Sequence, residues 1–302
     1  MEVVLSSPRG FCAGVVRAIE VVDLCLEKFG PPVYVKHQIV HNPYVVASLE
    51  KRGSITVEDV EDIPSGSVVV FSAHGSPPED FEKAEARNLR VIDATCPLVT
   101  RVHNEARKYH REGRKVLLVG HRGHQEVRGT MGQTPMTLVD EREESELPDW
   151  DGGTPVVVLT QTTLSVDDTQ AEVDQIKEKF PNSITKADIC YATTNRQQAA
   201  KELARNVDMV LVIGAQNSSN CNRLREVAEV QGVPAYLING PEDLDQAWLS
   251  DVDRVGITSG ASTPEVLVDE VISSLKPSSV TTLGGIEEDV TFVLPRELRR
   301  RS

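Results

Sequence analysis

Short apolar runs alternate along this sequence with longer segments whose apolar residues recur every three or four positions. This alternation is the feature that most constrains the fold. Runs such as Val68–Phe71 and Met209–Ile213 are rich in β-branched residues and too short for typical helices, so they predict buried strands. Stripes such as residues 15–29, with apolar side chains every three or four positions, predict helices that cover those strands. Strands that alternate with helices in this way predict an α/β fold with parallel sheets.

The predicted strands come in three groups, and their carboxyl ends run into small or polar residues. Because ligands bind outside the carboxyl ends of strands in open α/β sheets, we expect three similar α/β domains that face one central cavity. The expected domains are residues 13–96, 97–189 and 190–276. The N-terminal strand segment 1–12 is expected to join the third domain, and residues 277–302 to form a tail with a short strand at 290–293.

Length and charge narrow the class of protein. A chain of 302 residues with 39% hydrophobic residues can bury a substantial core. Its net charge of −14 argues against a general nucleic-acid binder, because binding to phosphates needs an excess of Lys and Arg. No basic leader and no apolar run near the length of a membrane span is found, so we expect a cytoplasmic protein without a membrane segment.

Three of the five cysteines follow predicted strands or precede predicted helices. Cys96 lies at such a junction, before Pro97, and Cys12 and Cys190 occupy junctions of the same kind. The unpaired amides and the dipole of a helix N-terminus favour a thiolate there. Three sulfurs are too few for a closed four-cysteine zinc site and suit a cluster with one iron that has no cysteine ligand. The alternative is that they are small buried side chains.

The other two cysteines are interpreted differently. Cys25 lies within a run of apolar residues at helical spacing and is expected in the core. For Cys221 two alternatives remain, a position beside the functional site or no role in it.

Several polar residues lie where predicted strands end or helices begin. His41, His74 and His124 could bind phosphate oxygens there, with a structural or surface role as the alternative for each. His103 and His110, on a polar helix, are expected to be solvated. Residues 218–220 (Ser218, Ser219 and Asn220) and Ser262 each precede a predicted helix, so they either cap it or provide hydroxyls and amides that bind an anion.

One carboxylate stands out in the Gly- and His-rich segment 120–129. Glu126 lies beside His124, and a carboxylate next to a bound anion and a metal is a candidate proton donor. The alternative is a solvated loop residue. Thr162, within residues 160–163, either helps to cap the next helix or relays protons.

Seven motifs taken together resemble those of the 4-hydroxy-3-methylbut-2-enyl diphosphate reductase family, which ends the non-mevalonate isoprenoid pathway. The resemblance follows the family's order and covers essentially the whole chain. The motifs are residues 11–15 (FCAGV), 72–75 (SAHG), 94–97 (ATCP), 123–126 (GHQE), 160–163 (TQTT), 188–195 (DICYATTN) and 217–220 (NSSN).

The resemblance implies a fold, a cofactor and roles for residues. It implies a pseudo-threefold trefoil of three α/β domains around a [4Fe-4S] cluster held by Cys12, Cys96 and Cys190. Glu126, aided by Thr162, would deliver protons as two electrons remove the substrate hydroxyl, which gives isopentenyl or dimethylallyl diphosphate. The diphosphate of this small-molecule substrate would be bound by His41, His74, His124, Thr162, Ser218, Ser219, Asn220 and Ser262.

The resemblance also implies an electron donor, a small ferredoxin or flavodoxin. The basic run Arg107, Lys108, Arg111, Arg114 and Lys115 is a candidate docking surface, with a solvated helix face as the alternative. Two other functions are alternatives to the reductase. One is a zinc hydrolase of a phosphorylated metabolite, and the other is a non-enzymatic iron–sulfur sensor, which the lack of a DNA-binding helix-turn-helix disfavours.

Overall fold

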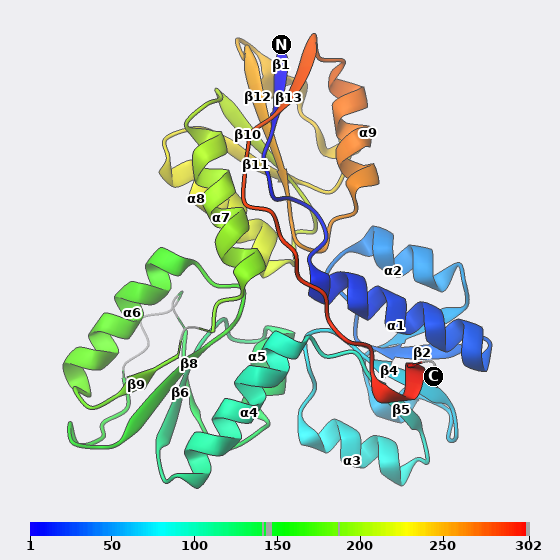
Figure 1. Ribbon diagram of the computed structural model, residues 1–302, viewed down its shortest axis with the longest axis vertical. Helices are drawn as coiled ribbons and strands as arrows, with labels where there is room; N and C mark the ends of the chain where they lie inside the picture. The colour runs from blue at the N-terminus through cyan, green and yellow to red at the C-terminus, as the bar shows by residue number, and fades with distance from the viewer. Residues whose placement is uncertain (141, 143–146, 187, 300–302) are drawn as a thin grey trace. The chain divides into compact units, whose positions relative to one another are not determined.

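The computed structural model describes residues 1–140, 142, 147–186 and 188–299 (Figure 1). Its chain divides into two compact units. Unit 1 comprises Met1–Val15, His41–Val45 and Tyr191–Thr291, and unit 2 comprises Val16–Val40, Val46–Cys190 and the chain from Phe292 onward. Parallel sheets with helices packed on them make up both units, so the α/β class predicted from the sequence is confirmed.

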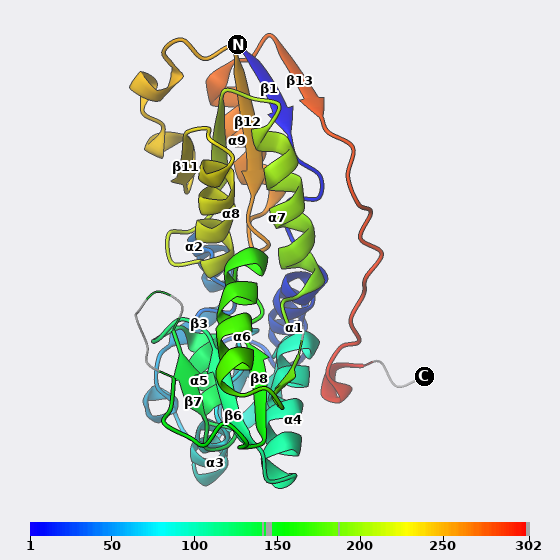
Figure 2. The ribbon, with the colours of Figure 1, turned by 90° about the vertical axis from the view of Figure 1, so that its left-hand side faces the viewer.

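Unit 1 is built on a five-stranded parallel sheet in the order β11-β10-β12-β1-β13. The first strand of the chain, β1, pairs on one side with β12 and on the other with β13, and Val3 lies opposite Val255 and Val280. Helices α7 and α8 cover one face and α9 the other (Figures 1 and 2). The elements are β1 (Glu2–Leu5), α7 (Tyr191–Ala204), β10 (Met209–Ile213), α8 (Ser219–Val230), β11 (Ala235–Ile238), β12 (Arg254–Ser259), α9 (Glu265–Leu275) and β13 (Ser279–Thr282).

Alternation of side chains along β10 fills both cores of this sheet. Val210 and Val212 pack with α7 and α8, whereas Leu211 and Ile213 pack with α9. All four are fully buried. A strand buried on both faces appears in the sequence as a continuous apolar run, which is why β10 is recognisable without an alternating pattern.

Unit 2 contains two four-stranded parallel sheets. The first has the order β3-β2-β4-β5, and α3 packs on the face that carries Val69 and Phe71. Its elements are α1 (Ala13–Phe29), β2 (Val33–Lys36), α2 (Pro43–Glu50), β3 (Ser54–Val57), β4 (Val68–Phe71), α3 (Pro78–Ala86) and β5 (Arg90–Asp93), with a 3₁₀ turn at Val60–Asp62. Helices α1 and α2 each have their first turn in unit 1.

The second sheet of unit 2 has the order β7-β6-β8-β9. Helices α4 and α5 cover the face formed by Val116, Leu118 and Val157, and α6 covers the face formed by Leu117 and Val158. The elements are α4 (Pro97–Arg111), β6 (Lys115–Val119), α5 (Gln125–Met131), β7 (Thr137–Val139), β8 (Val156–Thr160), α6 (Val166–Lys179) and β9 (Ile184–Thr185).

The strand predicted at residues 290–293 is wrong. That segment is irregular, and its Val290 and Val293 side chains are exposed, so it has no partner strand against which to bury them. The strand near the C-terminus is instead β13, whose four residues are all exposed. Short 3₁₀ turns complete the chain at Pro241–Asp243, Gln246–Leu249 and Arg296–Leu298. None of the helices described here is long and apolar enough to cross a membrane.

Candidate active site

The three cysteines singled out by the sequence all lie at helix starts. Cys12 directly precedes α1, Cys96 is the N-cap residue of α4, and Cys190 directly precedes α7. All three are partly exposed, and none of the cysteines in the described chain forms a disulfide. These positions combine access with a helix N-terminus, the setting in which thiolates are favoured as ligands.

The remaining two cysteines differ in both burial and pKa. Cys25 is fully buried in α1, as predicted, and burial raises its pKa to about 12. Cys221 is also fully buried, and burial raises its pKa to about 11 despite hydrogen bonds from Ser218 and Thr263. Neither thiol is placed to ionise, so Cys221 can act beside the site only through packing.

Each cysteine of the first group is held by its backbone amide. The Cys96 amide donates to the Ala73 carbonyl at 3.0 Å, and the Cys190 amide donates to the Thr162 carbonyl at 3.0 Å. In unit 1, the Cys12 amide donates to the Ala261 carbonyl at 3.1 Å. Each acceptor is a predicted site residue or the neighbour of one, because His74 follows Ala73 and Ser262 follows Ala261.

Glu126 is a buried acid rather than a solvated loop residue. It lies in the first turn of α5, where its Oε1 accepts the Thr162 amide at 2.7 Å and its Oε2 accepts the Thr162 hydroxyl at 3.1 Å. Burial raises its pKa to about 7, although the Thr162 hydrogen bonds oppose the shift, and the charge of Asp188 adds to it. A carboxyl group with this pKa can both hold and release a proton near neutral pH.

Thr162 therefore connects the acid to a cysteine. Its amide and hydroxyl bind Glu126, while its carbonyl accepts from the Cys190 amide. The alternative role, capping the next helix, belongs instead to Ser165, whose hydroxyl accepts the Asp168 amide at the start of α6.

Asp188 is a second buried acid, and the sequence reasoning gave it no role of its own. Burial raises its pKa to about 6, and the nearby charge of Glu105 adds to the shift. Its Oδ2 accepts the Thr160 amide at 3.4 Å, and its Oδ1 lies 3.6 Å from Arg101 Nη2. The position of Asp188 two residues before Cys190 was the only hint in the sequence of a role at the site, because the burial of its side chain cannot be predicted from one sequence.

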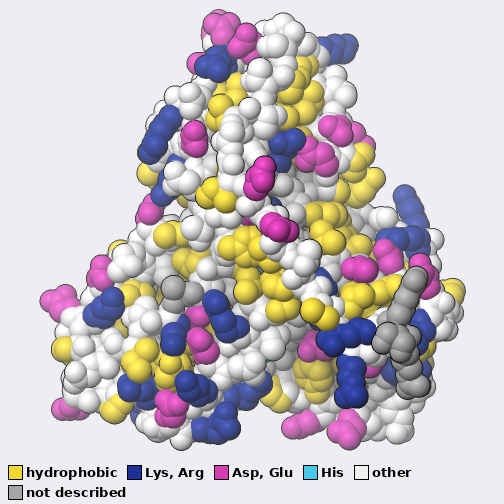
Figure 3. Space-filling model, viewed as in Figure 1, with side chains coloured by type: hydrophobic (Ala, Val, Ile, Leu, Met, Phe, Trp, Pro, Cys, Tyr) yellow, Lys and Arg dark blue, Asp and Glu magenta, His cyan; other side chains and the backbone are white. Residues whose placement is uncertain are grey.

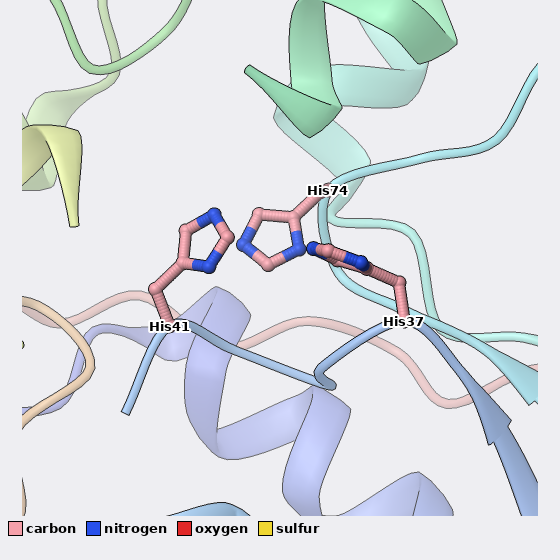
Figure 4. A group of neighbouring side chains, drawn as sticks. All are labelled: His37, His41 and His74. Carbon is pink, nitrogen blue, oxygen red and sulfur yellow. The ribbon is translucent and has the colours of Figure 1, made fainter. Parts of the chain in front are cut away.

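Two of the predicted histidines lie close together in unit 2. The ring centroids of His74 and His124 are 6.1 Å apart, and those of His37 and His74 are 5.9 Å apart. Figure 4 shows His37 and His74 edge to face; His41, also labelled there, belongs to unit 1. His124 is the N-cap of α5, and its Nδ1 accepts the Glu126 amide at 3.2 Å, which leaves Nε2 as the ring nitrogen able to donate.

In unit 1, the predicted anion-binding residues follow β10 and β12. Ser218 caps α8 by accepting the Cys221 amide, and the Ser262 hydroxyl donates to the His41 carbonyl at 3.0 Å. Asn220 is 5% exposed, and its Oδ1 accepts the Ala261 amide at 2.9 Å. Its Nδ2, however, has no hydrogen-bond partner among the described residues. A buried donor without a partner is costly, so this amide is suited to an anionic ligand.

The same two loops close around Cys221. A Cβ atom built on either Gly214 or Gly260 would overlap the Cys221 sulfur. Gly214 follows β10 and Gly260 follows β12, so the thiol fills the space between the two loops that carry Ser218, Asn220 and Ser262. This packing sets the spacing of those loops.

Two buried arginines support the backbone next to the cysteines, and the sequence reasoning missed both. In unit 1, Arg196 is 1% exposed and donates to the Gly10 carbonyl at 2.9 Å, two residues before Cys12. In unit 2, Arg17 donates to the Ala94 and Thr95 carbonyls, both at 3.1 Å, immediately before Cys96. Arginine side chains are seldom buried unless they have partners, so nothing in the sequence predicted that these two would lie in the interior.

His103 is not solvated, contrary to the prediction. It is buried beside Gly75, where a Cβ atom would lie 2.7 Å from its Cε1. Burial lowers its pKa to about 4, and the charge of Arg107 contributes. The absence of a side chain at Gly75 makes this space available to the imidazole ring.

Comparison with known proteins identifies the family. The model of the LytB protein family matches residues 3–276. The chain belongs to the LytB protein family. Among curated relatives, this member is 51% identical over 313 residues to the 4-hydroxy-3-methylbut-2-enyl diphosphate reductase of Pseudomonas putida (strain GB-1), with 100% of this chain and 99% of that protein covered. Reductase 1 of Rhodopseudomonas palustris is 52% identical over 301 residues, with coverages of 97% and 98%.

Solved structures agree with the family assignment. The E-1-hydroxy-2-methyl-but-2-enyl-4-diphosphate reductase of Plasmodium falciparum matches with a TM-score of 0.92 and 38% identity, over 99% of this chain and 96% of that one. A second reductase, described as the terminal enzyme of the non-mevalonate pathway, matches with a TM-score of 0.64 and 33% identity, over 91% and 99%. The resemblance drawn from the motifs is thus confirmed, and the alternative of a zinc hydrolase has no support from these relatives.

Proposed function

We propose that this chain is a 4-hydroxy-3-methylbut-2-enyl diphosphate reductase. It takes up two electrons and two protons, breaks the bond between the allylic carbon and the hydroxyl oxygen, and releases water together with isopentenyl or dimethylallyl diphosphate. The observation that carries the proposal is the buried Glu126 carboxyl, bound twice by Thr162, whose carbonyl in turn accepts the amide of Cys190. Full-length relatives named for this activity support it.

The proposed cofactor is a [4Fe-4S] cluster with Cys12, Cys96 and Cys190 as ligands. The donor set fits such a group, because these three thiols lie at helix starts and are partly exposed, whereas Cys25 and Cys221 are buried and hard to ionise. When bound, the cluster would supply electrons and one iron without a cysteine ligand that acts as a Lewis acid.

The substrate diphosphate is proposed to bind through His41, Ser218, Ser219, Asn220 and Ser262 in unit 1, and through His74, His124 and Thr162 in unit 2. The unpaired Nδ2 of Asn220 and the Nε2 of His124 are donors, which a strongly acidic protein needs in order to hold a trianionic ligand. Binding the diphosphate would fix the position of the reacting carbon.

Glu126 is proposed to donate the proton that turns the leaving hydroxide into water. Its carboxyl is protonated in a large fraction of molecules near neutral pH because burial raises its pKa to about 7. Thr162 keeps both carboxyl oxygens in place, so the proton is offered from a fixed position.

The decisive experiment is anaerobic turnover of 4-hydroxy-3-methylbut-2-enyl diphosphate with a chemical reductant, with the two products resolved by chromatography. We expect both products, a brown protein, and about four irons and four sulfides per chain. Stoichiometric zinc with release of phosphate would overturn the reductase in favour of a hydrolase. A cluster without turnover would favour an iron–sulfur sensor instead.

The electron donor is proposed to be a small ferredoxin or flavodoxin, and the compartment the cytoplasm. Each turnover consumes two electrons, which must be replaced before the next turnover, so an external carrier is required. The measurement is the rate of turnover with each purified carrier in place of the chemical reductant.

A further inference from the structure

Helix α4 carries an unusually basic surface for a protein of net charge −14. Its 15 residues include Arg101, Arg107, Lys108 and Arg111 and a single carboxylate, Glu105. All four cations are exposed, and the side chains of Arg101 and Lys108 are 47% and 58% exposed. The opposite side of the helix packs on the sheet through Val102 and Ala106, so these cations form the solvent face.

Lys186 joins this surface from the segment that leads to Cys190. Its Nζ lies 5.2 Å from the centre of the Tyr109 ring, and the Nζ of Lys108 lies at the same distance of 5.2 Å. Figure 3 shows Lys and Arg side chains gathered over the part of the molecule where Figure 1 places α4. We refer to Arg101, Arg107, Lys108, Arg111 and Lys186 as the α4 basic face.

The α4 basic face borders two of the proposed cluster ligands, both within unit 2. Cys96 is the N-cap of α4, one turn before Arg101. The Arg101 guanidinium in turn lies 3.6 Å from Asp188, two residues before Cys190. A carrier seated on this face would therefore lie beside the chain segments of both ligands, and electron transfer between proteins requires such a close approach.

A hollow beside Cys96 lies at one end of the face. It has a volume of about 480 Å³ and is lined by Thr95 and Pro97 on either side of Cys96, and by Arg17, Arg101 and Lys108. The acidic groups near this region are Asp93, Glu105, Glu112, the buried Asp188 and Glu82, which lines a neighbouring hollow together with Arg107. Asp93 is tied to Thr95, whose amide and hydroxyl both donate to it. The exposed cations outnumber the exposed acids.

We propose that the α4 basic face docks a small acidic one-electron carrier protein, with an edge of the carrier entering the hollow beside Cys96. The proposal rests on the proposed reductase activity, because only a reductive reaction needs such a partner. In each docking event the carrier loses one electron and the site gains one, so a turnover needs two events. Opposite charge on the two surfaces speeds encounter and orients the carrier, while the acidic remainder of the chain repels it.

The test uses two charge-reversal variants of the anaerobic holoenzyme. The first combines Lys108→Glu with Arg111→Glu, which lie on the face but do not touch the proposed ligands. The control combines Lys51→Glu with Lys177→Glu, which are exposed elsewhere in unit 2. Both variants lose two cations and gain two acids, so their formal net charges change equally. The probe is a plant-type [2Fe-2S] ferredoxin, and reduced methyl viologen serves as the small-molecule reductant.

We expect the first variant to lose about tenfold or more of its ferredoxin-driven turnover at low salt, while its viologen-driven turnover and the control variant stay within about twofold of wild type. High salt should shrink the difference, because it screens exposed charges. Titration calorimetry should show the same loss of ferredoxin affinity in cluster-bearing and cluster-free protein, because the docking face consists of side chains.

Equal loss in the control variant, equal loss with viologen, or undiminished ferredoxin affinity in the first variant would each overturn the docking proposal. Failure of the proposed function has a different signature. In that case wild-type protein would not reduce the diphosphate with viologen, while ferredoxin binding would still be measurable.

Discussion

The Glu288 carboxylate and the buried Arg196 guanidinium form an ion pair in unit 1, with Arg196 Nη1 3.0 Å from Glu288 Oε1 and the Glu288 side chain 13% exposed. The same guanidinium also binds the Gly10 carbonyl, so a residue of the C-terminal segment is coupled to the loop that carries Cys12. Through this pair, Glu288 supports the backbone next to a proposed ligand.

Replacement of Glu288 by Gln should test this coupling. The substitution leaves the buried Arg196 charge uncompensated, so we expect the free energy of unfolding to fall by about 2–4 kcal/mol and the iron content of anaerobically purified protein to fall with it. Urea unfolding and iron analysis measure the two effects. The control is Glu287→Gln at the exposed neighbouring position, and equal stability of the two variants would show that the pair contributes nothing.

Replacement of Glu126 by Gln removes the proposed proton donor but keeps the size of the side chain. We expect turnover to fall by about a hundredfold or more, with little change in diphosphate affinity or cluster content, because a positioned acid contributes about that much to proton transfer. Steady-state rates and calorimetric binding of the substrate separate the two effects. A near-normal rate in this variant would exclude Glu126 from the proton transfer.

The pH dependence of stability gives a second readout for the same variant. Because the pKa of Glu126 is raised from 4.5 to about 7, the native protein binds a proton more tightly than the unfolded chain. Its contribution to stability is therefore lost as the pH rises from about 4.5 to about 7. Glu126→Gln should abolish this loss, so the stability of the variant relative to wild type should increase as the pH rises from about 4.5 to about 7.

The pH dependence of turnover should follow the protonated form of Glu126. Turnover should fall as the pH rises through about 7, where the carboxyl loses its proton. The Thr162 hydrogen bonds lower this pKa, so Thr162→Val, which removes the hydroxyl bond, should move the fall to higher pH. Thr163→Val is the control. A profile that moves to lower pH in Thr162→Val would contradict the assigned hydrogen bond.

Thiol reactivity should divide the five cysteines into two classes. In cluster-free protein, Cys12, Cys96 and Cys190 should react rapidly with Ellman's reagent, while Cys25 and Cys221 should react only after unfolding because they are fully buried.

Cys221→Ala should weaken substrate binding and destabilise the fold by about 1–3 kcal/mol, because it opens a cavity between Gly214 and Gly260. Rapid reaction of Cys221 in the native protein would contradict this packing.

Much of the fold could be predicted because the central strands are continuous apolar runs. β10 and β8 are buried on both faces, so their positions follow from composition alone. The edge strand β13 has no buried residue, and nothing in its sequence distinguishes it from the irregular segment 290–293. Only the partner strand β1, nearly the whole chain away, decides which of the two forms a strand.

The candidate site, like the fold, could be predicted only in part. The cysteines, the histidines and Glu126 could be chosen as candidates because residue type and position at a predicted helix start are visible in a short stretch of sequence. The burial of Arg196, the pKa of Glu126 and the space that Gly75 provides for His103 depend on side chains distant in sequence. No local pattern contains that information.

The position of β1 between β12 and β13 has a consequence during synthesis on the ribosome. The strands of the other two sheets are each encoded in one continuous stretch, so those sheets can pair while translation continues. β1 emerges first but must wait until Arg254–Ser259 and Ser279–Thr282 have been made. Cys12 lies between β1 and α1, and its amide bonds to the Ala261 carbonyl, so the nascent chain cannot present this sulfur in its final setting until translation is nearly complete.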